Sequence, residues 1–126
     1  MRLWHESLIH LLPRQQLLGQ HRECCALRGN GWGKKHSTVD YVFNHSPYLL
    51  YMYHMAVIHE MDLRRYKIND VWLDENYRGK NCNPWSGFNE VYGYYTDTIY
   101  PEHNDHYLKE CLDNLASKGI HISEVS

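Results

Sequence analysis

PRQQLLGQHRECCALRG, residues 13–29, is the first of three segments of the chain that stand out as helical. Proline is favoured in the first turn of a helix and glycine just after the last, so we expect a helix from near Pro13 to near Gly29. At about 100° per residue, its leucines and cysteines gather on one side. Gly19 lies on the other side, one turn before Arg22 and Glu23. Gly19 either lets another helix pack closely against this one or opens space beside the two charged side chains. The pattern of this helix by itself favours close packing.

Two further helices are expected. Ser46 and Pro47 form an N-cap followed by proline, and the helix that they start should run to about Tyr66. It is apolar on most sides, which indicates the central, buried helix, with His54 as a hydrogen-bonded core histidine. The third helix follows Pro101 and shows an i, i+3, i+4, i+7 apolar stripe. Its end is predicted from glycine followed by isoleucine at 119–120, which suits a Schellman motif.

The stretch 67–100 has no strong periodicity and is rich in tryptophan and tyrosine. A segment this long without periodicity is usually a functional loop or a folded cover. Its aromatic side chains either stack on nucleic-acid bases or build a small satellite core. The predicted fold is therefore all-α: one compact three-helix domain over residues 1–126, with a long, irregular, aromatic-rich insert at about 67–100.

Composition excludes several classes of protein. The chain has 126 residues, of which 43% are hydrophobic and 22% charged, as in a folded globular protein. The longest nearly apolar run, residues 48–58, is too short for a membrane span of roughly 20 residues. Residues 1–6 lack the apolar core of a signal peptide. We therefore expect a cytoplasmic protein with no membrane partner.

Charge is unevenly distributed along the chain. Residues 1–36 carry six basic and two acidic side chains, whereas residues 37–126 carry seven basic and 13 acidic ones. A basic first third suggests a surface that faces an anion. The loop 29–36 adds three glycines and the pair Lys34 and Lys35, so it either tracks a phosphate backbone or is a plain flexible turn.

Cysteines and histidines give only weak signals for a metal. The four cysteines form no C-x-x-C pair, and adjacent Cys24 and Cys25 suit buried thiols in a reducing compartment. The ten histidines form no H-E-x-x-H motif. His103 and His106 can share a helix face beside Asp105, which leaves a histidine-dependent metalloenzyme as an alternative. We predict no metal and no cofactor.

A family resemblance adds to these observations. The stretch QLLGQHRE, residues 16–23, resembles the first helix of the pyrimidine dimer DNA glycosylases, the phage-type endonuclease V family, in which an Arg-Glu dipeptide occupies this helix. The helix start at 46–47 and the segments 110–112 and 118–122 resemble later parts of the same family in the same order. The chain is most similar to short bacterial members.

The resemblance implies an all-α DNA repair enzyme. It would be a glycosylase with abasic-site lyase activity on double-stranded DNA with a damaged base, including pyrimidine dimers, or an abasic site. The family's nucleophile is the N-terminal amine, which forms an imine, and a glutamate on the first helix transfers protons. By this resemblance the catalytic residues are Met1 and Glu23, and Arg2 and Arg22 hold phosphates.

The chain also departs from the family pattern. Arg2 is too large to permit removal of the initiator methionine, so the nucleophile would be the amine of Met1. Ala26 stands where the family has a further arginine, and Arg28 is the candidate to replace it. With Lys34 and Lys35, Arg28 completes the predicted DNA-binding set. These departures keep open a second alternative, a non-catalytic nucleic-acid-binding module of the same fold.

Overall fold

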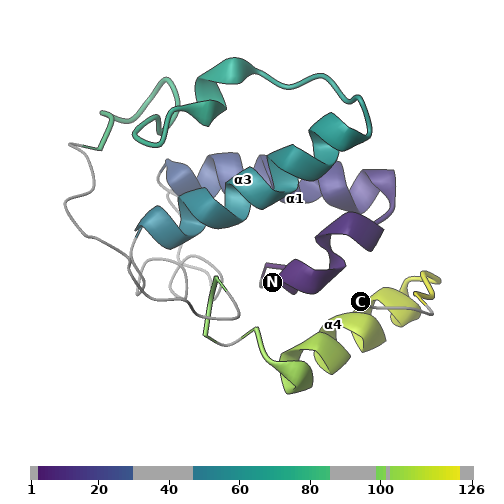
Figure 1. The fold of residues 1–126 in the computed structure, drawn as a ribbon. Helices are drawn as coiled ribbons and strands as arrows, with labels where there is room; N and C mark the ends of the chain where they lie inside the picture. The colour runs from purple at the N-terminus through teal and green to yellow at the C-terminus, as the bar shows by residue number, and fades with distance from the viewer. Residues whose placement is uncertain (1–2, 30–46, 86–98, 102, 123–126) are drawn as a thin grey trace.

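The computed structural model describes residues 3–29, 47–85, 99–101 and 103–122. This part contains α-helices, short 3₁₀ helices and no strand, which confirms the predicted all-α fold (Figure 1). In chain order the elements are η1 (Glu6–Leu11), α1 (Arg14–Arg28), α3 (Pro47–Leu63), η3 (Asp70–Leu73) and α4 (Asp105–Ser117). No helix in these ranges is long and apolar enough to cross a membrane.

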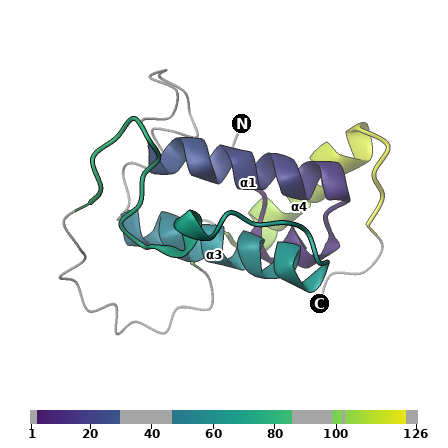
Figure 2. The same cartoon turned by 90° about the horizontal axis from the view of Figure 1, so that it is seen from above.

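Helices α1 and α3 form the centre of the fold. They run antiparallel and side by side, and α4 lies apart from them beyond η1 (Figures 1 and 2). Helix α1 begins just after Pro13 and ends at Gly29, whose N–H donates to the carbonyls of Ala26 and Cys25. The bounds predicted from proline and glycine are confirmed, because Pro13 cannot extend the helix backwards and Gly29 closes its last turn.

Helix α3 ends at Leu63, three residues earlier than predicted. Arg65 adopts a left-handed backbone with φ of 63°, and the N–H of Tyr66 donates to the carbonyl of Met61 at 2.9 Å. This is a Schellman ending with arginine in the position that glycine usually takes. No glycine marks the end in the sequence, so the apolar pattern alone suggested a longer helix.

Helix α4 follows the predicted course. The side chain of Asn104 accepts from the N–H of Tyr107 and caps its start. At its end Gly119 has φ of 81°, and the N–H of Ile120 donates to the carbonyl of Leu115 at 2.9 Å. Glycine tolerates this backbone without strain. The predicted Schellman motif is confirmed.

The hydrophobic core joins η1, α1, α3 and α4. Fully or nearly fully buried members include Leu8, Leu17, Leu27, Leu50, Tyr53, Val57, Tyr100 and Leu115. The sequence analysis did not anticipate η1, which buries Leu8 and Ile9 under α3. The N-terminal segment is also tied to α4, because the Tyr107 hydroxyl donates to the carbonyl of Leu3.

The described part of the insert, residues 67–85, passes over α3 and has only η3 as regular structure (Figure 1). Trp72 and Tyr77 pack edge to face, with ring centroids 4.8 Å apart. Arg78 donates to the carbonyls of Arg28 and Gly29 at the end of α1. The irregular course is confirmed for this part, and residues 86–98 lie outside the described ranges.

Candidate functional site

Trp4, near the start of the chain, is fixed against α1 by Gln20. The backbone N–H of Trp4 donates to Oε1 of Gln20 at 2.8 Å. The hydroxyl of Tyr53 on α3 lies 2.5 Å from the carbonyl of Trp4 and 3.1 Å from the same Oε1. Both Gln20 and Tyr53 are buried. The position of residues 3–4 is therefore set by two helices and not by the segment itself.

Glu23 lies one helical turn after Gln20. Its side chain is 8% exposed. No hydrogen bond or ion pair joins its carboxylate to any residue in the ranges that the structure describes. Side chains at i and i+3 are roughly 5–6 Å apart at Cβ. Trp4 is therefore attached one helical turn from Glu23.

Arg22 is exposed, and Gly19 opens space beside it. A Cβ built on Gly19 would lie 3.8 Å from Nη2 of Arg22, and no other atom of the described residues lies within 4 Å. The expectation that another helix packs closely on Gly19 is therefore wrong for this part of the chain. The alternative expectation applies beside Arg22, because the missing side chain of Gly19 leaves space next to the Arg22 guanidinium.

Arg28, in contrast, is completely buried. Its guanidinium donates to the carbonyls of Trp72, Asp74 and Tyr77 at 2.5–3.1 Å, and Nη1 lies 3.1 Å from Nδ1 of His54. Contact with a DNA phosphate would require these bonds to open. We therefore leave Arg28 out of the proposed DNA-binding surface and assign it to holding the insert against α1 and α3.

The remaining predicted site residues, Met1, Arg2, Lys34 and Lys35, lie outside the described ranges. Their predicted roles stay predictions.

A second polar cluster joins α1 and α3. Nε2 of His54 lies 2.9 Å from Nδ1 of His21, and Sγ of Cys25 lies 3.8 Å from Nε2 of His21 and 3.9 Å from Nε2 of His54. One ligand atom from each side chain falls within 4.8 Å of the others, a separation that suits a metal ion. His54 is a buried, hydrogen-bonded core histidine as predicted. The sequence signal that was missed is the i, i+4 pair of His21 and Cys25 on one helix face.

The other predicted histidine pair does not form. His103 precedes α4 and is 2% exposed, stacked on His5 with centroids 5.1 Å apart. His106 lies in the first turn of α4 with its side chain 84% exposed, 3.3 Å from Glu110. The two imidazoles therefore do not share a face.

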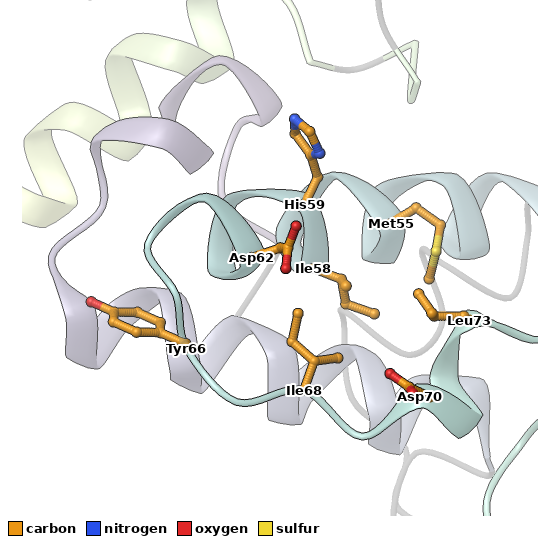
Figure 3. Close-up of a pocket in the computed structure, with 8 residues that line it drawn as sticks. All are labelled: Met55, Ile58, His59, Asp62, Tyr66, Ile68, Asp70 and Leu73. Carbon is orange, nitrogen blue, oxygen red and sulfur yellow. The ribbon is translucent and has the colours of Figure 1, made fainter.

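A groove of about 560 Å³ separates the second half of α3 from the segment 66–73 (Figure 3). Ile58 and Ile68 face each other across it, and Asp62 and Asp70 lie along it. It contains none of the predicted site residues. Two carboxylates would repel phosphate, so this groove is not the DNA surface.

Two imidazoles, the buried His54 and the half-buried His21, make the stability of the fold depend on pH. Burial, reinforced by His21 and Arg28, lowers the pKa of His54 well below its ordinary value of 6.5. Burial also lowers the pKa of His21, with neighbouring arginines adding to the effect. Both histidines are therefore neutral in the folded protein at neutral pH.

We predict that the free energy of unfolding falls as pH drops below 6.5. The unfolded chain then binds protons that the folded chain rejects, which gives a slope of up to about 1.4 kcal/mol per pH unit for each such histidine. Glu6, whose pKa burial raises above its ordinary value of 4.5, has the opposite effect at the acidic end of the range, because its contribution is lost as pH rises through its folded pKa. Urea unfolding at pH 7.5, 6.5 and 5.5 measures how the free energy of unfolding changes with pH. His54→Asn should reduce this slope by up to the contribution of about one proton. A stability that is flat or rises towards pH 5.5 would contradict this.

The family model of the pyrimidine dimer DNA glycosylases matches residues 1–74, more than half of the chain. The matched region contains η1, α1, α3 and η3, and with them Gln20, Glu23 and Tyr53. The chain belongs to the pyrimidine dimer DNA glycosylase family. No curated protein matches it, and no solved structure does either.

Proposed function

We propose that this protein is a DNA glycosylase with abasic-site lyase activity, which acts on double-stranded DNA containing pyrimidine dimers or abasic sites. The family supports the dimer as substrate. The observation that carries the chemistry is the attachment of residues 3–4 to Gln20, one turn from the buried Glu23. This attachment holds Trp4, near the start of the chain, one helical turn from a carboxylate.

The α-amino group of Met1 is the nucleophile in this proposal. An α-amino group has a pKa near 7.7–8.0, against about 10.4 for lysine, so roughly 10–15% of it is neutral at pH 7. The neutral amine attacks C1′ of the damaged nucleotide, the C1′–N bond breaks and the base leaves with the bond's electron pair. Nitrogen then loses a proton, the C1′–O4′ bond opens and O4′ takes up a proton, which leaves a protonated imine between Met1 and C1′.

Glu23 moves the protons in the second step. Its carboxylate takes the C2′ proton of the imine, and the electrons expel the 3′ phosphate, which cuts the strand by β-elimination. The target nucleotide must first leave the stack to bring C1′ to the amine. Arg22, exposed beside Gly19, contacts the phosphate backbone, and Arg2, Lys34 and Lys35 extend the same basic set.

Strand cleavage tests the proposal. The untagged protein is incubated with three matched duplexes, which carry a cyclobutane dimer, an abasic site or neither. We expect cleavage of the first two and none of the third. Tight binding to the first two without cleavage would instead favour the non-catalytic module, and no preference over undamaged DNA would overturn both.

We predict that Gln20 positions the nucleophile. Gln20→Ala removes the acceptor of the Trp4 N–H, so residue 4 loses its bond to α1, while the Tyr53 hydroxyl still reaches the Trp4 carbonyl. A misplacement of about 1 Å can cost on the order of 100-fold in rate. We expect kcat for abasic-site cleavage to fall about 10- to 100-fold while the Kd for DNA changes less than about twofold.

Gln15→Ala is the matched control, because Gln15 is exposed on the same helix. It should leave kcat and Kd unchanged. Circular dichroism is used to confirm that the Gln20→Ala variant is folded. If its kcat then equals that of the Gln15→Ala control, Gln20 does not position the nucleophile.

A further inference from the structure

We propose that His21, Cys25 and His54 form a binding site for a soft, closed-shell metal ion, Cu⁺ or Zn²⁺. His21 and Cys25 lie one turn apart on α1, and His54 meets them from α3. Thiolate and imidazole are the ligands that these two ions prefer in proteins. The site lies across the helix pair that forms the centre of the fold.

The separations of the ligand atoms suit such an ion. With metal–nitrogen bonds of about 2.0–2.1 Å and metal–sulfur bonds of about 2.3 Å, neighbouring ligands lie roughly 3.3–3.8 Å apart. Sγ of Cys25 is already 3.8 and 3.9 Å from the nearest ring nitrogens of His21 and His54. His21 can offer only one ring nitrogen to an ion: Nε2 is the one near Cys25, whereas Nδ1 is the one 2.9 Å from Nε2 of His54. One ligand atom from each side chain lies within 4.8 Å of the others, so binding requires a small rearrangement of the His21 ring.

The protonation states also favour binding. Burial keeps both imidazoles neutral at neutral pH, so their lone pairs are available. Burial raises the pKa of the Cys25 thiol to about 11, so the ion must displace the thiol proton to solvent. Affinity should therefore increase with pH.

Arg28 determines which ion fits better. It donates to Nδ1 of His54, so in the metal-free protein Nε2 carries the hydrogen and donates to His21. Ligation through Nε2 moves that hydrogen to Nδ1 and costs one hydrogen bond of Arg28, whose bonds to backbone carbonyls remain. Cu⁺ with one thiolate leaves the local charge unchanged beside the guanidinium, whereas Zn²⁺ adds one positive charge. The charge therefore favours Cu⁺.

This site is separate from the proposed active site. Cys25 follows Glu23 by two residues, which places the two side chains about 200° apart around α1. Metal binding is therefore a property in its own right, and its test does not depend on activity towards DNA.

Two titrations of the untagged, reduced, metal-stripped protein test the proposal. In the first, Co²⁺ is added as a spectroscopic substitute for Zn²⁺, and Zn²⁺ is then used to displace it. In the second, the protein competes without oxygen for Cu⁺ held by a coloured chelator. We expect one equivalent to bind, with a thiolate-to-cobalt charge-transfer band in the first titration. If Zn²⁺ displaces Co²⁺ but the protein does not take Cu⁺ from the chelator, the site is a zinc site. If the protein takes Cu⁺ from the chelator but does not bind Co²⁺ and Zn²⁺, the site is a copper site.

Variants locate the binding. Cys25→Ser should abolish the charge-transfer band and weaken binding more than about 100-fold, beyond the loss typical of changes outside the ligand set. His21→Asn should weaken binding while its half-exposed position spares the fold, and His59→Asn, an exposed histidine on α3, is the matched control. The proposal would be overturned if no charge-transfer band appeared and the protein also failed to compete for Cu⁺. It would also be overturned if the band survived Cys25→Ser, or if His59→Asn weakened metal binding as much as His21→Asn.

Discussion

Replacing Glu23 with glutamine is expected to slow strand cleavage at an abasic site by about 10²- to 10⁴-fold, the usual contribution of a general acid–base group. The amide keeps the shape of the side chain but cannot accept the C2′ proton. Glu23 is buried on α1, and its carboxylate has no hydrogen-bond partner among the described residues, so Glu23→Gln breaks no bond that the structure shows. The fold and the Kd for DNA should therefore stay the same.

Single-turnover cleavage of an abasic duplex measures the effect, together with the Kd from fluorescence anisotropy. Glu75→Gln, at an exposed position in the insert, is the control and should cleave at the parent rate. If Glu23→Gln cleaves within about threefold of the parent, the proton transfer belongs to another residue and the proposed mechanism is wrong.

Replacing Arg28 with methionine is expected to lower the free energy of unfolding by at least about 1.5–3 kcal/mol, the usual contribution of a hydrogen bond that involves a charged group. Methionine keeps most of the volume but leaves the carbonyls of Trp72, Asp74 and Tyr77 without their donor. A buried polar group without a partner loses its full desolvation free energy. The same change removes the cation–π contact with the Trp72 ring, whose centroid lies 5.1 Å from the guanidinium carbon.

Arg22→Met is the matched control, six residues earlier on the same helix and exposed. It should change the stability by no more than about 0.5 kcal/mol. It should also weaken DNA binding and reduce the slope of log K against log salt by about one. Urea unfolding of both variants and salt titrations of DNA binding separate the two arginines. Similar unfolding free energies for the two variants would contradict the structural role of Arg28.

Local signals in the sequence predicted the helices well. Pro13 and Gly29 bound α1, and Gly119 closes α4, because proline restricts the backbone and lacks an N–H, whereas glycine tolerates conformations that end a helix. The end of α3 was missed because Arg65 adopts a left-handed backbone conformation, which is not predicted for arginine from the sequence. η1 was missed because its six residues are too few to show a period.

The site was predicted only where its signal was local or carried by the family resemblance. The Arg22–Glu23 pair was singled out in this way. The burial of Arg28 was not, because its carbonyl partners lie 44, 46 and 49 residues further along the chain. The contact between His21 and His54 spans 33 residues and is equally invisible in the sequence. The attachment of Trp4 to Gln20 also emerged only from the fold.

Trapping the imine with borohydride tests the central claim most directly. The protein is incubated with an abasic duplex and borohydride, and the stable adduct is digested and mapped by mass spectrometry. A variant with Gly-Ser placed before Met1 is the control, since two added residues move the amine by up to about 7 Å. The account predicts an adduct on the amine of Met1, formed far more slowly in the extended variant. An adduct on a lysine, or no adduct from folded protein that begins with Met1, would contradict it.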